Sequence, residues 1–216
     1  MITVRALPKT GGCDRAASYI GLVMSELVTK DIGFALFETA IGHCGIVWSE
    51  RGVAGVQLPE RNEQATRNRM LRRFAGAREA VPPDVVQRAI ADIVALLGGE
   101  PRDLTYVTID TDGLADFNRR VYAIARTIPP GATLSYGEIA ERLGDRSLAR
   151  DVGQALGQNP IPIIVPCHRV LAAGAKPGGF SARGGTATKL KMLAIEGAYV
   201  NHTPSLFGDA PAGMRH

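Results

Sequence analysis

A thiol stands beside two basic side chains in the stretch IPIIVPCHRV, residues 161–170, where His168 and Arg169 follow Cys167. Consecutive side chains diverge in an extended or turning segment, so His168 cannot lie directly against the sulfur. A histidine that accepts the thiol proton through a water, with a carboxylate holding its tautomer, would produce a nucleophilic thiolate. The sequence therefore indicates a candidate nucleophile at Cys167, and we expect the charge of Arg169 to lower the thiol pKa.

The competing interpretation is that Cys167 is a small buried hydrophobe, which is the commoner role of a lone cysteine. Two features favour the nucleophile. His168 and Arg169 are costly to place beside an apolar strand, and Pro162 and Pro166 stiffen the segment. We therefore expect a rigid, functional thiol with polar neighbours.

Composition limits the other kinds of protein and site. The 216 residues are 45% hydrophobic and 21% charged, which is ordinary for a globular chain. Without a long apolar run or a leader cleavage pattern, we expect a cytoplasmic protein that does not span a membrane. Cys13, Cys44 and Cys167 are odd in number and dispersed, which argues against disulfides and against a bound metal. The net charge of +4 is mild evidence for a polyanionic partner.

The first half of the chain predicts a small sheet. Residues 1–30 show no clean period, and we expect them to be an extension. Three apolar runs, at 33–38, 44–49 and 52–58, are separated by glycine or charged turns. This pattern predicts an antiparallel meander.

Two helices and a further strand are expected after the meander. Helical spacing occupies residues 61–76 and then 83–99, and residues 103–110 alternate like a strand. These elements complete an α+β unit over residues 31–110. The first of these helices and its flanks are rich in arginine, which we interpret as a solvated face without an assigned function. The arginines are Arg61, Arg67, Arg69, Arg72, Arg73 and Arg78.

The second half, residues 111–216, predicts mainly helices. The first helix stops at a double proline. In the second helix, Ser135 and Glu138 form a capping box, which makes Tyr136 the first helical residue and Gly144 the residue after the end. A three-residue link then leads to a third helix. So brief a link between two short helices is the spacing of a helix-turn-helix.

The third helix has two different faces at about 100° per residue. The apolar arc contains Leu148, Val152, Ala155 and Leu156. The opposite arc contains Arg150, Gly153, Gln154 and Gly157. Two glycines there cost about 1 kcal/mol each relative to alanine, so close approach of a bulky partner is expected to offset them. On spacing alone, DNA binding and an ordinary helical hairpin stay equally open.

The stretch NPIPIIVPCHRV, residues 159–170, belongs to an ordered series of motifs that extends from residue 117 to residue 197. The others lie at 135–136, 150–153, 179–181 and 195–197. This series resembles the O6-alkylguanine-DNA alkyltransferases, also called methylated-DNA-protein-cysteine methyltransferases. The resemblance implies an α+β fold, with a small N-terminal ribonuclease-H-like α/β domain and a mostly helical, winged helix-turn-helix-like C-terminal domain. The first half resembles the family only in size and in strand-helix order.

The resemblance also implies the catalytic residues. Cys167 would be the acceptor thiolate, His168 its water-linked base and Glu196 the carboxylate that orients the imidazole. Asn159 would hold the thiol in place. Tyr136 would protonate the departing guanine and help to turn the nucleotide out of the duplex.

Further residues are implied in substrate and DNA binding. The substrate-binding set is Pro162, Val170, Phe180 and Ser181. The DNA-binding set is Tyr136, Arg150, Gly153, Gln154 and Arg169. Within these sets, Pro162 and Phe180 would line the alkyl pocket, and the Ser181 amide would bond the base oxygen. Arg150 would fill the gap that the everted base leaves in the stack.

The implied function is DNA repair with a single turnover. A carbon attached to guanine inside a duplex is out of reach, so the base must be flipped. The transferred alkyl group would form a thioether with Cys167, and no group in the sequence would expel that sulfur again. We expect no cofactor and no metal, with double-stranded DNA containing O6-alkylguanine as the partner. The expected assembly is a monomer, and its cooperativity on DNA stays open.

Three alternatives are weighed against this function. A non-catalytic lesion-binding protein would lack the acceptor, so Cys167 speaks against it. A helix-turn-helix regulator of the adaptive-response kind would carry a zinc-binding module, and none appears here. A thiol protease fits worst, because the papain-type surroundings of the nucleophile are missing.

Two positions depart from the family pattern. The chain reads FSARGG at residues 180–185 where the family has Tyr-Ser-Gly-Gly, so the loop gains Ala182 and Arg183 and lacks a phenol hydroxyl. Asp151 lies on the third helix, which would be the recognition helix, at a position where the family usually has a small residue. The first departure leaves the preferred size of the alkyl group open, and the second leaves the strength and groove geometry of DNA binding open.

Overall fold

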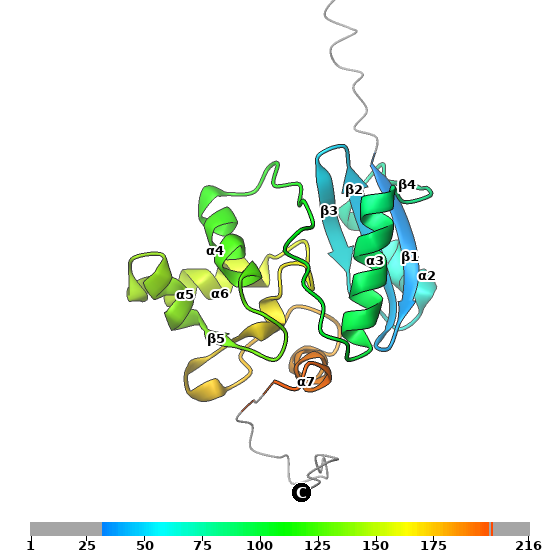
Figure 1. Cartoon of the computed structure of the whole chain (residues 1–216). Coiled ribbons are helices and arrows are strands. Elements are labelled where there is room, and N and C mark those ends of the chain that lie inside the picture. The colour runs from blue at the N-terminus through cyan, green and yellow to red at the C-terminus, as the bar shows by residue number, and fades with distance from the viewer. Residues whose placement is uncertain (1–31, 199, 201–216) are drawn as a thin grey trace, which may run out of the picture. The chain divides into compact units, whose positions relative to one another are not determined.

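A four-stranded sheet forms the first half of the described chain (Figure 1). The computed structural model describes residues 32–198 and 200, so the expected extension at 1–30 lies outside the described residues. The strand order is β3-β2-β1-β4, with β1 antiparallel to β2, β2 antiparallel to β3 and β1 parallel to β4. The strands are β1 (Gly33–Thr39), β2 (Gly42–Ser49), β3 (Gly52–Gln57) and β4 (Arg78–Glu79). The predicted antiparallel meander is therefore confirmed.

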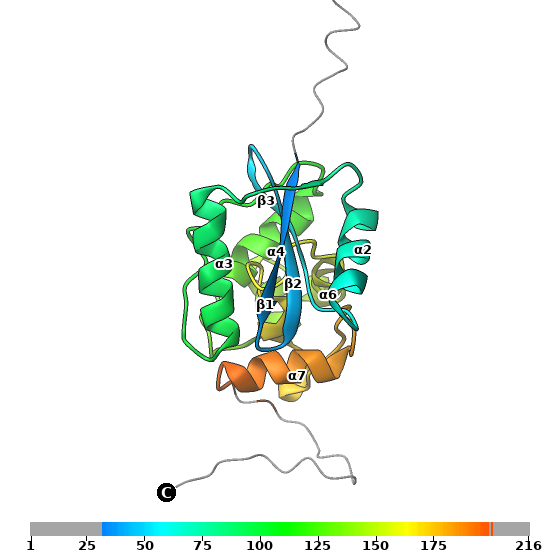
Figure 2. The ribbon, with the colours of Figure 1, turned by 90° about the vertical axis from the view of Figure 1, so that its right-hand side faces the viewer.

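Two helices, α2 (Glu63–Arg73) and α3 (Asp84–Leu97), lie on opposite sides of this sheet, as Figure 2 shows. Alternation along β2 explains both contacts, because successive side chains point to opposite faces. Val47 packs in one cluster with Met70 of α2, whereas Ile46 joins the larger cluster that contains Ile93 of α3. Both helices predicted in this half are confirmed.

The strand predicted at residues 103–110 is wrong. The carboxylate of Asp103 accepts hydrogen bonds from the backbone N–H and the hydroxyl of Thr105, at 2.8 Å each, and the chain turns there. Ile109 forms an isolated bridge to Val53 of β3. A local side-chain bond thus prevails over the alternating pattern that suggested a strand.

The second half is mainly helical, with one short pair of parallel strands. Its helices are α4 (Asp116–Arg126), α5 (Tyr136–Arg142), α6 (Ala149–Gly157) and α7 (Thr186–Ile195), and its strands are β5 (Leu134–Ser135) and β6 (Val170–Leu171). The predicted capping box is confirmed: Ser135 Oγ accepts from the Glu138 N–H at 3.1 Å, and the Glu138 carboxylate accepts from the Ser135 N–H at 2.6 Å. Gly144 adopts φ +103° after α5, in the left-handed region that favours glycine. The mixed α+β fold predicted from the sequence is confirmed.

Helix α6 packs its apolar face against the rest of the second half. Val152, Ala155 and Leu156 are buried, whereas Arg150 and Gln154 are exposed, so the predicted two-sidedness is confirmed. A 3₁₀ turn, Arg146–Leu148, precedes the helix and closes the link from α5. The α5–α6 pair therefore leaves one polar helix face in contact with solvent.

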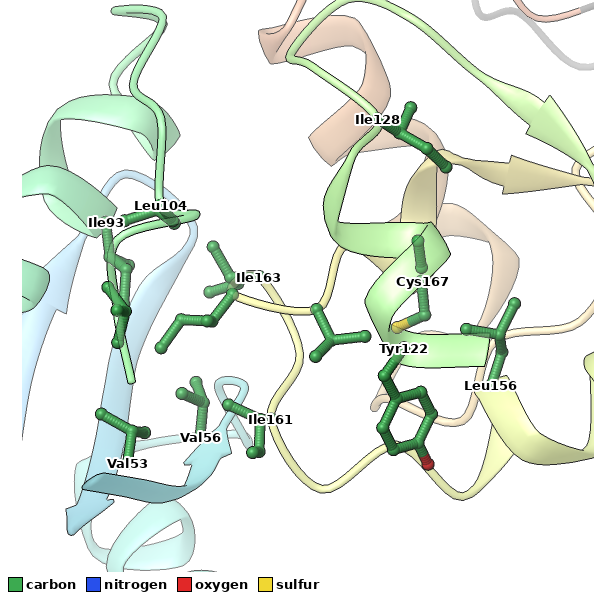
Figure 3. Close-up of a cluster of buried hydrophobic side chains, with 14 of the residues drawn as sticks. Val53, Val56, Ile93, Leu104, Tyr122, Ile128, Leu156, Ile161, Ile163 and Cys167 are labelled. Carbon is green, nitrogen blue, oxygen red and sulfur yellow. The ribbon is translucent and has the colours of Figure 1, made fainter. Parts of the chain in front are cut away.

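One hydrophobic cluster joins the sheet to the segment that carries the thiol. Figure 3 shows Val53 and Val56 of β3 and Ile161 and Ile163 in the same cluster as Cys167. The Val56 N–H also donates to the Pro160 carbonyl at 3.0 Å. Residues 161–165 are all buried, so this segment is fixed by the core on both sides. Among residues 32–198 and 200, no helix has the length and hydrophobicity of a membrane span.

Candidate functional site around Cys167

Cys167 opens a 3₁₀ turn, Cys167–Arg169, directly after the buried segment. The side chain of Asn159 holds this segment in shape. Its Nδ2 donates to the Val165 carbonyl at 2.8 Å, and its Oδ1 accepts from the Ile161 N–H at 3.0 Å. Both bonds lie within residues 159–165, so Asn159 fixes the segment that leads to the thiol.

Two cavities meet at Cys167, which is 8% exposed. The sheet-side cavity, about 210 Å³, is lined by Gln57, Glu60, Arg69, Arg73, Asn159, Pro162 and residues 180–183, among others. The helix-side cavity, about 540 Å³, is lined by Tyr136, Arg150, Gly153 and Gly179, among others. Gly157, Cys167, Phe180 and Ser181 line both. The thiol therefore borders one cavity beside α6 and one beside the sheet.

Burial raises the pKa of the Cys167 thiol. The Asn159 side chain, the charge of Lys189 and two backbone N–H groups act in the opposite direction and favour the thiolate. The expectation that Arg169 lowers this pKa is wrong, because the guanidinium of Arg169 is bound to Glu196 and the cation acting on the thiol is Lys189. A thiol held in its protonated form at rest needs a base to become a nucleophile.

His168 and Glu196 form the pair that could supply this base. His168 Nε2 lies 2.9 Å from Glu196 Oε1, and both side chains are buried, at 0% and 2% exposure. Burial lowers the pKa of His168, which favours the neutral imidazole. With Nε2–H donated to the carboxylate, Nδ1 is the proton-accepting nitrogen. Nδ1 is buried and has no hydrogen-bond partner within the described residues.

Arg169 belongs to the same buried network. Its Nε and Nη2 donate to the two oxygens of Glu196 at 2.8 Å each, and its Nη1 donates to the Ile128 carbonyl at 2.6 Å. The side chain is buried, so its observed position does not fit the expected contact with DNA at the surface. Arg169 instead fixes the carboxylate that holds His168.

Lys189 of α7 is a site residue that the sequence interpretation missed. It is fully buried, its Nζ donates to the Val170 carbonyl, and it lies 5.9 Å from the centre of the Tyr136 ring. Burial lowers its pKa to about 8, while the Cys167 thiolate would raise it. The spacing of Lys189 with the buried Met192 and Leu193 was a usable signal, because residues three and four apart share a helix face.

The remaining predicted residues divide between the cavities and the core. Pro162 lines the sheet-side cavity, and Phe180 and Ser181 line both cavities. Val170 is fully buried outside both, and its carbonyl accepts the bond from Lys189. The DNA-binding candidates Tyr136, Arg150 and Gly153 line the helix-side cavity, whereas Gln154 lies on the exposed face of α6.

Tyr136 lines the helix-side cavity and carries a phenol hydroxyl. Burial raises the pKa of its phenol, and a charge on Cys167 would raise it further, so the hydroxyl keeps its proton. A β-carbon on Gly178 would come within 3.0 Å of this hydroxyl, and Gly178 also has φ +66°. The close approach of Gly178 therefore limits movement of the Tyr136 ring on that side.

Cys44, by contrast, is placed as a structural thiol. It is 0% exposed inside the core, and burial raises its pKa to about 12. Its one polar neighbour in the described chain is the Thr39 hydroxyl, at 3.8 Å. Within the described part of the chain, no three metal-ligating side chains gather, so that part offers no candidate metal site.

The sequence relatives of this chain include several proteins named methylated-DNA–protein-cysteine methyltransferase. A family model for the "6-O-methylguanine DNA methyltransferase, DNA binding domain" matches residues 116–198. A methylated-DNA–protein-cysteine methyltransferase of Methanothermobacter thermautotrophicus is 31% identical over 153 residues, which cover 71% of this chain and 78% of that protein. Its namesake from Mycolicibacterium paratuberculosis is 41% identical over 125 residues, covering 58% and 73%.

Solved structures agree with the sequence relatives. The crystal structure of an O6-methylguanine methyltransferase from Mycobacterium tuberculosis matches with a TM-score of 0.61 and 32% identity, over 77% of this chain and 93% of that one. Mycobacterium tuberculosis OGT in complex with DNA matches with the same TM-score and identity, over 76% and 92%. Each likeness covers more than three quarters of this chain.

Proposed function

Because the chain belongs to the methylated-DNA–protein-cysteine methyltransferase family, we propose that it repairs O6-alkylguanine in double-stranded DNA with Cys167 as the alkyl acceptor. It is a single-turnover transferase that flips the damaged base out of the duplex. The observation that carries the assignment is the position of Cys167, at the meeting point of two cavities and followed directly by the buried His168–Glu196 pair. The presence of this thiol disfavours a purely lesion-binding protein.

The transfer step follows from the polarity of the site. The thiol proton passes through a water to His168 Nδ1, and the sulfur attacks the alkyl carbon. The bond from that carbon to guanine O6 breaks, and its electron pair stays on the purine. Tyr136 gives the departing purine a proton. The site as a whole keeps its charge, because His168 has taken up the proton of the thiol. Lys189 stabilises the sulfur anion before it attacks, and Glu196 stabilises the imidazolium that forms.

The helix-side cavity is the proposed entry for the everted base. It runs from the exposed face of α6 to Cys167, and Arg150 and Gly153 of that helix line it. The long, exposed side chain of Arg150 suits it to occupy the gap left in the base stack. Gly153 and Gly157 of α6 both line this cavity. Because glycine has no side chain, these two positions leave the cavity wider than larger residues would.

The finer architecture is part of the same proposal. We assign residues 31–110 to a ribonuclease-H-like N-terminal domain and residues 111–216 to a winged helix-turn-helix-like domain, preceded by an extension at 1–30. The antiparallel meander with helices on two sides supports the first assignment. The closely packed α5–α6 pair with its exposed polar face supports the second.

Label stoichiometry tests the proposed function. Duplex DNA carrying a labelled methyl group on guanine O6 should pass at most one equivalent of label to the protein, because the thioether has no leaving route. Peptide mapping should place the label on Cys167. Clearance of excess lesion by substoichiometric protein would contradict the single-turnover reaction.

An Arg150→Ala change tests the entry route. Transfer from duplex should slow by about tenfold, because one filled gap in the stack is worth on the order of 1–3 kcal/mol. Transfer from the free base O6-methylguanine should change less than about twofold, since no stack is opened. Single-turnover rates measure both. Arg142→Ala removes the same charge from the exposed surface of α5 and serves as the matched control; equal slowing on duplex and free base would rule out a wedge.

A further inference from the structure

The sheet-side cavity carries an arginine cluster that the transfer chemistry leaves unused. Arg69 and Arg73 of α2 line it from one side, and Arg183 of the loop 180–185 lines it as well. Glu60 is the single carboxylate among the lining residues. Cys167 lines the same cavity, so the acceptor sulfur and the guanidinium groups border one space.

The protein itself provides these guanidinium groups with few hydrogen bonds and with no carboxylate at hydrogen-bond distance among the described residues. Arg69 lies 3.8 Å from Glu60, beyond hydrogen-bond distance. Arg73 donates to the neutral amide oxygen of Gln57 at 3.1 Å and pairs with no carboxylate among the described residues. The Arg183 side chain has neither a hydrogen bond nor an ion pair with any residue in the described ranges. By contrast, Arg67 and Arg51 each bond a carboxylate directly.

Arg73 is also held in position before any ligand arrives. Gln57 is buried, and its Nε2 donates to the Leu58 carbonyl at 2.9 Å, which turns its Oε1 toward Arg73. Burial and the neighbouring charge of Arg69 both lower the pKa of Arg73. A fixed guanidinium that lacks a counter-ion is a preorganised site for a carboxylate or another planar anion.

The neighbouring cavity determines what such an anion would be attached to. In the proposed reaction the base enters through the helix-side cavity, and the transferred carbon must reach the sulfur of Cys167. Pro162 and Phe180, the residues expected to contact the alkyl group, line the sheet-side cavity. Atoms attached to the transferred carbon therefore have the sheet-side cavity, with its arginines, open to them.

We propose that the sheet-side cavity selects O6-alkyl groups that end in a carboxylate, with Arg73 and Arg183 binding that carboxylate. The inference rests on the proposed function and adds a substrate class to it. For an O6-carboxymethyl group, the sulfur attacks the methylene carbon, the bond from that carbon to O6 breaks, and guanine leaves with the electron pair and takes a proton. The product on the protein is S-carboxymethylcysteine at position 167.

Single-turnover rates on three duplexes test this inference with the full-length chain. The duplexes carry O6-methylguanine, O6-carboxymethylguanine or the neutral O6-propylguanine, and the modified peptide is identified by mass. Wild type should transfer carboxymethyl faster than propyl. Arg73→Met and Arg183→Met should each slow carboxymethyl transfer by about tenfold, the usual worth of one charged hydrogen bond, and change methyl transfer by less than about twofold.

Arg72→Met is the matched control, because Arg72 is exposed on the same helix and is not among the residues that line this cavity. Arg183→Met lies in a loop, so it tests the inference even if the change at the end of α2 disturbs folding. Equal slowing of all three substrates would mean that the arginines bind DNA phosphates, and it would overturn the inference. Methyl transfer without carboxymethyl transfer by wild type would overturn it and leave the proposed function intact.

Discussion

Replacement of Cys167 by serine should abolish alkyl transfer, by more than about 1,000-fold, because an alcohol is a far weaker nucleophile than a thiolate at neutral pH. Binding to the lesion should persist, since the helix-side cavity and the exposed face of α6 keep their other residues. Transfer of a labelled methyl group from duplex measures the first effect, and fluorescence anisotropy of labelled duplex measures the second.

Cys44→Ala is the matched control for this variant. Cys44 is 0% exposed, and burial raises its pKa to about 12, so its loss should leave one equivalent of transfer unchanged. Some loss of stability is expected, because a side chain is removed from the core. Residual transfer by Cys167→Ser, with label found on Cys44, would show that the acceptor has been misassigned.

Glu196→Gln should have the second largest effect, on rate and on stability together. The change leaves Arg169 buried without its counter-ion, which costs on the order of 3 kcal/mol. It also removes the acceptor that holds His168, so transfer should slow by about 10- to 100-fold. Urea unfolding and single-turnover rates measure the two effects. Glu100→Gln, which breaks an exposed pair with Arg102, should change neither.

The pH profile distinguishes a relay from a purely structural carboxylate. Loss of Glu196 should move the pH midpoint of the transfer rate, because the base that receives the thiol proton is changed. An unchanged midpoint with a lower Tm would reduce Glu196 to a structural role.

Acid should remove the contribution of Glu196 to stability. Burial alone would raise its pKa, but hydrogen bonds from His168 and Arg169 outweigh burial and lower the pKa to about 2, from 4.5. Because the folded pKa lies below the unfolded one, the stabilisation is complete above about pH 4.5 and is lost as the pH falls toward 2. The difference in unfolding free energy between wild type and Glu196→Gln should therefore shrink over that interval.

Sequence patterns predicted the elements whose signals are local. The meander follows from alternation and turns, α5 follows from the capping box of Ser135 and Glu138, and α6 follows from one apolar face. The strand at 103–110 failed for an equally local reason, because the Asp103 side chain competes for the backbone. Alternation does not reveal that competition.

The candidate site was predictable where it is continuous in sequence and less so where distant segments meet. Cys167 and His168 are visible as neighbours, and the family resemblance supplied Glu196. Periodicity alone did not reveal that Arg169 would turn inward to Glu196, or that the helix α7 would bring Lys189 under Tyr136. The arginines of α2 looked like an ordinary solvated face, because their shared cavity with Cys167 forms only through the packing of two halves.

The double access to Cys167 has a consequence for how the protein would be inhibited. Duplex DNA on α6 would obstruct one route to the sulfur, but the opening beside β3 and α2 lies elsewhere on the chain. A small anionic electrophile entering from there could inactivate the protein without competing with DNA. Inhibitors built for that opening would therefore keep their potency when the genome is heavily damaged.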